Sequence, residues 1–437
     1  MSQELDKIFI YATSGPEWHE RIREIHAAVR MTTYFEDGSE DDKRLCEILR
    51  RVKTGKDSAI QEYTLELDGV PLTPEDFRIQ KPAIEKAHRE IEQNLLASIR
   101  RAIENVRNYQ TEIFIGKIKH VGIKYTPIQR VGVCVPGASA PLPSTVIMTV
   151  VPAQVAGVKE IVIVSPPRYK GSIHPVILAV CNELGIEEVY RIGGAQAIAT
   201  LAFGTQSIRP VEKIVGPGNA WVQMAKRKVF GIVDIDSIAG PSEVLIIAND
   251  KANPEWVAAD MLSQAEHAPG SAVVFSDSKT LGRRVLEELK KQIDNLDRKE
   301  ATLKCLLNFG AIIIFPDIDT IIQQANYFAP EHLEIQCGSD SKKMADRIIN
   351  AGAIFIGDYS PVAVGDYWAG PSHTLPTGMT AKFFSALSAN DFIKASSIIE
   401  YDKEKLAASA EDIIRLAEAE GLDAHARSIR IRQNTGG

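Results

Sequence analysis

The pattern of hydrophobic and polar positions divides the chain into a helical first third and an alternating remainder. Between 83 and 109, apolar residues recur at helical spacing over many turns, which predicts a long helix. Thr73 precedes a proline and two acids, the composition of a capped helix start. The first third is therefore predicted to be mostly helical.

Short apolar segments then alternate with helical ones. Predicted strands cover 160–165, 189–192, 213–215, 243–248, 272–276, 311–315, 333–336 and 353–357. Predicted helices between them cover 174–184, 196–202, 220–229, 255–266, 281–289, 318–325 and 342–350. Strand–helix alternation of this kind is typical of parallel sheets with helices on both faces. The two series predict an α/β protein with two domains side by side.

Two segments depart from this alternation. Residues 131–158 carry no charge, but the prolines and glycines among them favour a buried strand, a loop and a packed helix over a membrane span. After about Phe383 the strands are predicted to stop, and the tail from Asn390 has a helical pattern. That tail has too little apolar bulk to fold alone, so we expect it to pack on another surface, such as a second subunit.

Composition narrows the class of protein. The chain has 437 residues, 45% of them hydrophobic and 24% charged, as in a soluble globular enzyme of two or three domains. Its net charge of −7 argues against a nucleic-acid or anionic-membrane binder. Five cysteines without a CxxC pair exclude a disulfide framework. The first residues lack a signal-peptide pattern, so a cytoplasmic protein is expected.

Four polar side chains from distant motifs are candidate metal ligands. Gln264 and His267 lie three residues apart at a predicted helix end and so share a face. Asp366 lies in a glycine- and proline-rich loop after the last predicted strand, where we expect it outside the carboxyl ends of the strands. His425 follows a predicted helix end. Each motif alone is equally typical of a helix cap or a turn. Together they offer nitrogen and oxygen donors that suit Zn²⁺, Mn²⁺ or Co²⁺.

Two further motifs are candidates for proton transfer and cofactor binding. Glu331 and His332, adjacent before a predicted strand, could serve as acid and base. The segments 193–196 and 216–219 are glycine-rich, follow strands and open helices, so they are compatible with a dinucleotide or with ordinary turns. The basic run 226–228 is predicted to be a solvated helix face.

Taken in order, the motifs resemble those of the histidinol dehydrogenase family. The segments that carry the resemblance are GPGNAWVQMAKRKVFG, DIDSIAGPSEVLIIA, SQAEHAPGS, APEHLE, GDYWAGPSHTLPTG and EGLDAHARSIRIR. The resemblance extends from about Ile22 to Arg432 and implies two incomplete Rossmann-like domains with parallel sheets. The implied division is an N-terminal helical segment (1–27), a metal-binding and catalytic α/β domain (28–133 and 243–387), an NAD-binding α/β domain (134–242) and a helical tail (388–437).

The resemblance also implies the reaction. Family members oxidise L-histidinol through L-histidinal to L-histidine, a four-electron reaction that uses NAD and one Zn²⁺ per subunit, at the end of histidine biosynthesis. They are homodimers in which the tail reaches the partner's site. Two alternatives stay open: a related dehydrogenase of another small polar alcohol, and a zinc hydrolase in which Glu331 activates water.

The resemblance assigns roles to individual positions. The implied zinc ligands are Gln264, His267, Asp366 and His425, and the implied catalytic pair is Glu331 and His332. The implied substrate contacts are Ser242, Gln264, His267, His332, Asp366, Glu420 and His425. The implied NAD contacts are Cys134, Gln196 and Asn219. The chain departs from the family pattern at Cys134, where a tyrosine is usual, and at Ala138, where a second glycine is common.

Overall fold

The computed structural model describes residues 2–12, 17–31, 35–137, 141–267 and 269–433. Ala138 lies outside the described residues, so its predicted effect on cofactor binding stays a prediction. The chain divides into two compact units. The first contains Met1–Gly116 and Pro127–Ile393, and the second contains Lys117–Thr126 and Lys394–Gly437.

The predicted helical first third is confirmed. Its helices are α1 (Glu17–Met31), α2 (Glu40–Asp68), α3 (Lys81–Glu90) and α4 (Gln93–Ile113). The continuous helix predicted for 83–109 is wrong, because Glu92 ends one helix and caps the next. Its carboxylate accepts hydrogen bonds from the backbone N–H groups of Asn94 and Leu95. This N-cap satisfies donors that a continuous helix would have paired internally.

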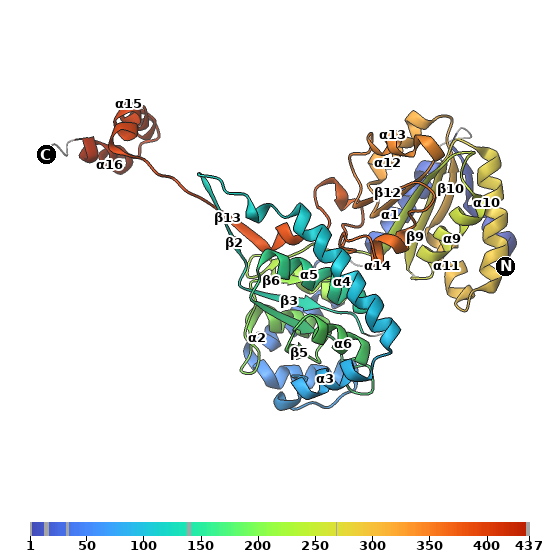
Figure 1. The fold of residues 1–437 in the computed structure, drawn as a ribbon, viewed down its shortest axis with the longest axis horizontal. Helices are drawn as coiled ribbons and strands as arrows, with labels where there is room; N and C mark the ends of the chain where they lie inside the picture. Colours follow the sequence, from blue (N-terminus) through green and yellow to red (C-terminus); the bar gives the residue numbers. More distant parts are fainter. Residues whose placement is uncertain (1, 13–16, 32–34, 138–140, 268, 434–437) are drawn as a thin grey trace. The chain divides into compact units, whose positions relative to one another are not determined.

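Among the described residues, one sheet of the first unit has five parallel strands in the order β5-β4-β3-β6-β7. Figure 1 labels β3, β5 and β6 of this sheet. The strands are β3 (Arg130–Cys134), β4 (Glu160–Val164), β5 (Glu188–Tyr190), β6 (Lys213–Val215) and β7 (Asp234–Ile235). The helices that follow them are α5 (Pro143–Ala156), α6 (Pro175–Glu183), α7 (Gly194–Phe203) and α8 (Ala220–Val229). No helix among the described residues is long and apolar enough to cross a membrane.

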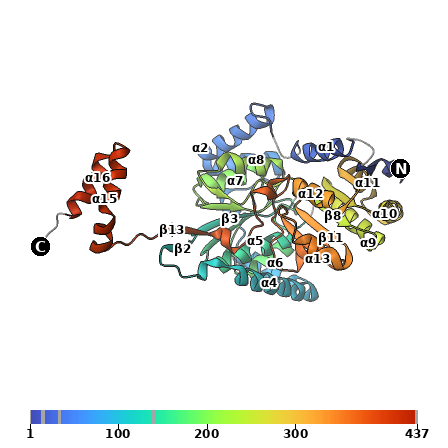
Figure 2. The same cartoon turned by 90° about the horizontal axis from the view of Figure 1, so that it is seen from above.

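Helices cover both faces of this five-stranded sheet. Figure 2 shows α2, α7 and α8 on one face and α4, α5 and α6 on the other. The apolar side chains of α3 to α6 form one buried cluster with Val131 and Val133. Those of α2, α7 and α8 form a second cluster with Val162 and Ile214. The apolar faces of α2, α3, α4 and β3, which the predicted division groups with the metal-binding domain, are buried with this five-stranded sheet.

The other sheet of the first unit has six parallel strands among the described residues, in the order β1-β10-β9-β8-β11-β12. They are β1 (Phe9–Tyr11), β8 (Ser242–Ala248), β9 (Gly270–Ser276), β10 (Gly310–Ile314), β11 (His332–Gln336) and β12 (Ala353–Ile356). Its helices are α9 (Pro254–Ala265), α10 (Lys279–Gln292), α11 (Lys299–Phe309), α12 (Ile318–Phe328), α13 (Ser341–Ala345) and α14 (Val362–Tyr367).

The two sheets share one topology. Without the edge strand β1, the six-stranded sheet has the order β10-β9-β8-β11-β12, which matches β5-β4-β3-β6-β7 strand for strand. Each sheet starts in its middle, adds two strands on one side and then crosses to the other side. This is the order of the first five strands of the doubly wound dinucleotide-binding fold, whose crevice lies where the order reverses, at the carboxyl ends of the first and fourth strands.

The second unit holds the tail. Its elements are β2 (Ile123–Pro127), β13 (Ile393–Ser397), α15 (Lys403–Ala419) and α16 (Asp423–Gln433). The prediction that strands stop after Phe383 is wrong, because β13 pairs with β2. Gly421, with φ of 73°, follows the end of α15 as predicted.

Candidate functional site

The amino-terminal edge of the six-stranded sheet carries a cluster of polar side chains. Oε2 of Glu331 accepts hydrogen bonds from Oγ of Ser242, at 2.6 Å, and from the backbone N–H of Glu243, at 2.8 Å. Ser242 is the first residue of β8 and His332 the first of β11, and these neighbouring strands run parallel. The topology therefore brings together two motifs that are about 90 residues apart in sequence.

His332 is held by the same edge. Its Nδ1 lies 3.0 Å from the backbone oxygen of Glu243 and 3.4 Å from Oε2 of Glu331. Its Nε2 lies 3.7 Å from Oδ1 of Asp366 and has no hydrogen-bond partner among the described residues. Burial opposes a charge on the ring, but the carboxylates of Glu331 and Asp366 overcome it and raise the pKa of His332 well above its usual value.

Glu243 is a buried carboxyl group that the sequence did not single out. Burial and the nearby charge of Glu331 raise the pKa of Glu243 to about 8. Its Oε1 accepts a hydrogen bond from the backbone N–H of Gly378, which ties the loop after Asp366 to β8. Glu243 could have been recognised from the sequence as a glutamate in the otherwise apolar strand of GPSEVLIIA. An acid in a strand that is buried on both faces is itself buried, at a cost in free energy that suggests a function.

Three of the four predicted metal ligands lie in the first unit. Nε2 of Gln264 is 3.4 Å from Nδ1 of His267, and Asp366 lies close enough to both His267 and His332 that their charges lower its pKa against the effect of burial. His425 belongs to α16 in the second unit. No group of three or more His, Cys, Asp or Glu residues capable of holding a metal occurs within the described ranges.

The residues present fit a metal even so. Oε1 of Gln264 is buried and has no hydrogen-bond partner in the described part of the chain. A buried amide oxygen without a donor carries a desolvation penalty that a cation would remove. Asp366, with its lowered pKa, is ionised at neutral pH and can coordinate a cation. An amide oxygen, a carboxylate and an imidazole are donors that zinc accepts.

The predicted position of Asp366 outside the carboxyl ends of the strands is wrong. The chain leaves β12 at its carboxyl end, but α14 brings Asp366 to within 3.7 Å of His332, the first residue of β11. Gln264 and His267 likewise lie just before the amino end of β9. In a parallel sheet every helix end leads into the amino edge, so these side chains gather there.

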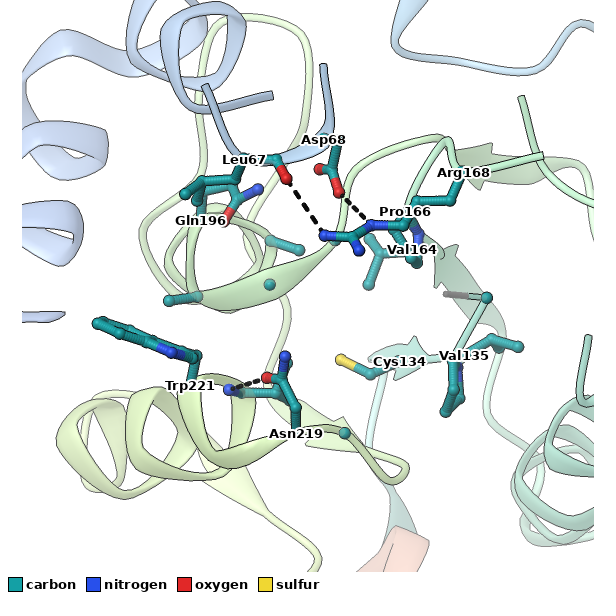
Figure 3. A pocket seen from close by; sticks show the side chains of 18 of the residues that line it. Leu67, Asp68, Cys134, Val135, Val164, Pro166, Arg168, Gln196, Asn219 and Trp221 are labelled. Atoms are coloured by element: carbon teal, nitrogen blue, oxygen red, sulfur yellow. Dashed lines mark hydrogen bonds and ion pairs between the residues drawn. The ribbon is translucent and has the colours of Figure 1, made fainter. Parts of the chain in front are cut away.

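A cavity of about 690 Å³ opens at the carboxyl ends of β3, β4 and β6 in the five-stranded sheet (Figure 3). The predicted NAD contacts Cys134, Gln196 and Asn219 all line it. Oδ1 of Asn219 accepts a hydrogen bond from the backbone N–H of Val222 and so caps α8, whose N-terminus borders the cavity. The structure thus brings together three residues that the sequence placed in separate motifs.

Cys134 is a buried residue at the end of β3. Burial raises the pKa of its thiol to about 12, so the sulfur is a neutral, small side chain and no nucleophile at neutral pH. The loop after β6 passes close to Cys134 because it begins with Gly216. The φ of Gly216 is 107°, and a Cβ there would lie 2.3 Å from the backbone oxygen of Cys134. A glycine is required for this approach of β6 to β3.

The prediction of a solvated helix face for 226–228 is wrong for Lys226, which is buried, whereas Lys228 is exposed. Lys226 is 1% exposed, forms an ion pair with Asp236, and its Nζ donates to the backbone oxygen of Gly216, at 3.1 Å. Oδ2 of Asp236 accepts from the N–H of Gly216 at 2.7 Å. Lys226 stands in helical phase with Val222 and Val229, a signal of burial that sequence reasoning missed. The pair holds Gly216, the residue directly before Pro217 and Gly218 of the cavity lining.

Comparison with known proteins decides the family. A family model described as histidinol dehydrogenase matches residues 34–433. The chain belongs to the histidinol dehydrogenase family. It is therefore an oxidoreductase of histidine biosynthesis, and the hydrolase alternative is set aside.

Individual relatives agree over most of their length. The chain is 46% identical over 398 residues to histidinol dehydrogenase of Moorella thermoacetica, with 89% of this chain and 94% of the relative covered. It is 45% identical over 392 residues to that of Rhodopirellula baltica, with 88% and 85% covered. The crystal structure of histidinol dehydrogenase from Elizabethkingia anophelis matches with a TM-score of 0.88, 33% identity and 97% coverage of both chains.

Proposed function

We propose that this chain catalyses the NAD-dependent, zinc-dependent oxidation of L-histidinol through L-histidinal to L-histidine. Family membership supports the reaction. The observation that carries the assignment to this chain's own residues is the cluster of Ser242, Glu331, His332 and Asp366 at one sheet edge. An acid, a base and a metal-binding carboxylate at one edge are the groups that an alcohol and then an aldehyde oxidation need.

Gln264, His267 and Asp366 would hold the metal, with His425 as the fourth ligand. Bound zinc would supply a Lewis acid and a template for the imidazole and amine of the substrate. Gln264 contributes a buried oxygen that lacks a donor, and Asp366 contributes the negative charge. We place His425 and Glu420 in the same set because they match the family's motif EGLDAHA.

His332 and Glu331 divide the proton transfers. Nδ1 of His332 donates to the backbone oxygen of Glu243, so Nε2 is the nitrogen that faces Asp366. A cation bound by the Asp366 carboxylate would remove part of the charge that raises the pKa of His332, and Nε2 could then take up the hydroxyl proton of the alcohol. Oε2 of Glu331 is occupied by two hydrogen bonds, so Oε1 is the oxygen that activates water for attack on the aldehyde. Each oxidation delivers a hydride to NAD, whose binding site we place in the cavity lined by Gln196 and Asn219.

The deciding experiment is an absorbance assay of the purified, zinc-loaded protein with NAD and L-histidinol. We expect two NADH for each L-histidine formed. L-histidinal as the starting substrate should give one NADH. A related alcohol such as L-threoninol tests the alternative substrate class, and faster turnover of that alcohol would move the substrate assignment away from histidinol. No NADH from L-histidinol would contradict the proposed reaction.

We also propose a homodimer in which the tail completes the partner's site. The buried apolar residues of α15 and α16 are small alanines, such as Ala410 and Ala417, whereas Leu416, Leu422 and Ile431 are exposed within the described part of the tail. Helices that expose their large apolar side chains need another surface to be stable.

Mixed dimers test this arrangement. Glu331→Gln and His425→Asn are each expected to be inactive, because each spoils both sites of its own dimer. Co-expression pairs the chains at random, so about half of the dimers are mixed, and in each of these one site is intact. Activity should return to about a quarter of the wild-type value. A co-expressed sample as inactive as its parents would rule out the shared site.

A further inference from the structure

An ion pair stands at the cavity of the five-stranded sheet, beside the end of β4. Nε of Arg168 lies 2.9 Å from Oδ1 of Asp68, and another guanidinium nitrogen donates to the backbone oxygen of Leu67 at 3.2 Å (Figure 3). Arg168 follows β4, and Asp68 is the last residue of α2. Both line the cavity. Neither residue belongs to the sequence motifs assigned to cofactor binding.

One of the two carboxylate oxygens of Asp68 accepts no hydrogen bond among the described residues. Its side chain is only 4% exposed, whereas that of Arg168 is 46% exposed. Oδ2 of Asp68 is buried and has no hydrogen-bond partner among the described residues. A buried carboxylate oxygen without a donor carries a large desolvation penalty. Because Asp68 lines the cavity, a hydroxyl group of a ligand in the cavity would remove that penalty.

The position of the pair in the topology identifies that hydroxyl. In the order β5-β4-β3-β6-β7, β4 occupies the place of the second strand of the doubly wound dinucleotide-binding fold. At the end of this strand such proteins place an acid that binds the ribose 2′-hydroxyl of NAD, or an arginine that binds the 2′-phosphate of NADP. Here the four residues after β4, 165–168, have the sequence SPPR, which contains no acid and ends with Arg168. The acid is supplied instead by α2.

We propose that Asp68 determines the cofactor specificity of this chain. Its Oδ2 accepts a hydrogen bond from the 2′-hydroxyl of the adenosine ribose, and its ion pair neutralises Arg168. A 2′-phosphate would meet the carboxylate at close range, which disfavours NADP. The chain therefore selects NAD, although it carries the arginine typical of an NADP site. This inference rests on the proposed binding of NAD in this cavity.

The test compares the wild type with Asp68→Asn in direct binding. The probes are adenosine 5′-monophosphate and adenosine 2′,5′-bisphosphate, measured by calorimetry on the full-length protein. The wild type should prefer the monophosphate. Asp68→Asn removes the negative charge and leaves Arg168 available to the 2′-phosphate, so the preference should shift toward the bisphosphate by at least about tenfold. The ratio of kcat/KM for NADP and NAD should shift in the same direction.

Two further variants separate this role from a structural one. Asp68→Asn combined with Arg168→Leu should lose the gained affinity for the bisphosphate. Asp319→Asn is the control, because it breaks an aspartate–arginine pair between α12 and Arg347, beside the other sheet, and should leave the ratio unchanged. A ratio of two affinities is measured on the same folded molecules, so partial misfolding of a variant does not imitate the shift.

The outcomes distinguish this inference from the proposed function. NADH production with a bisphosphate-to-monophosphate ratio that stays unchanged in Asp68→Asn would overturn the role of Asp68 alone. A wild type that prefers the bisphosphate would overturn it as well. A wild type that binds neither NAD nor the monophosphate would overturn both the inference and the proposed cofactor site.

Discussion

The two sheets of the first unit share one strand order apart from the edge strand β1, yet their candidate functional residues lie at opposite edges. The five-stranded sheet has its cavity at the carboxyl ends of β3, β4 and β6. The six-stranded sheet has Ser242, Glu331 and His332 at the amino ends of β8 and β11. A site can form at either edge of a parallel sheet. The side chains at the two edges decide at which of them it forms.

Local detail explains the difference at the carboxyl edge. In the five-stranded sheet, Gly216 lets the loops after β3 and β6 approach closely, and α7 and α8 begin beside a cavity of about 690 Å³. The corresponding edge of the six-stranded sheet has a cavity of about 240 Å³, lined by charged side chains such as Asp340 and Arg347. A dinucleotide needs the larger space, so a duplicated topology need not bring a duplicated site.

Metal removal should have the largest effect on activity, and it should affect the edge of the six-stranded sheet and not the cavity of the five-stranded sheet. A chelator should abolish NADH production, because the proposed ligands Gln264, His267 and Asp366 would lose the ion that is proposed to position the substrate. Circular dichroism should stay near native, since both sheets have extensive apolar cores. The affinity for NAD, measured by calorimetry, should be unchanged within twofold. Full activity in protein shown to be metal-free would contradict the assigned ligands.

Glu331→Gln should lower the rate of L-histidinal oxidation by roughly 10²–10⁴-fold, the usual cost of losing a general base. Oxidation of L-histidinol to the aldehyde should lose less, because His332 takes up that proton. Single-turnover measurements of the two half-reactions separate the effects. His332→Asn serves as the comparison and should slow both. An equal loss in both half-reactions for Glu331→Gln would contradict its role.

Lys226→Met tests how the buried ion pair holds the loop at Gly216, next to the cavity of the five-stranded sheet. It leaves Asp236 buried without its partner, which should cost about 3–5 kcal/mol of unfolding free energy in urea. The NAD affinity should fall with it, because the Gly216 loop loses its brace. Lys213→Met is the matched control, since its partner Asp234 is solvent-exposed and the cost should be about 1 kcal/mol or less. Equal costs for both variants would refute this role of Lys226.

The effect of Glu243→Gln on stability should depend on pH. The pKa of Glu243 is about 8 in the folded protein and 4.5 in the ordinary case. Between these values the folded protein retains a proton that the unfolded chain releases, so stability falls as pH rises through that window. The variant should therefore gain unfolding free energy relative to the wild type from pH 5 to pH 8. A stability difference between the variant and the wild type that does not change with pH would contradict a buried neutral acid at Glu243.

Much of this fold was predictable from the sequence, because burial leaves periodic traces. The predicted strand at 213–215 and the predicted helix at 220–229 match β6 and α8, since short apolar runs and helical spacing report local structure directly. The strand at 393–397 was missed, because IKASS is mostly exposed and its pairing with β2 is a long-range event. The break at Glu92 was missed because an N-cap competes with a favourable helical pattern.

The sequence by itself determined which residues are chemically suited to a site, because motif spacing and residue type are local properties. Glu331, His332, Gln196 and Asn219 could be named from the chain alone. Only the tertiary structure decided where they gather. Strand order set His332 beside Ser242, and α14 carried Asp366 back to the amino edge. It also placed Asp68 against Arg168, 100 residues away. The sequence around Asp68 and around Arg168 does not indicate that contact, because contacts between distant segments depend on how helices and strands pack.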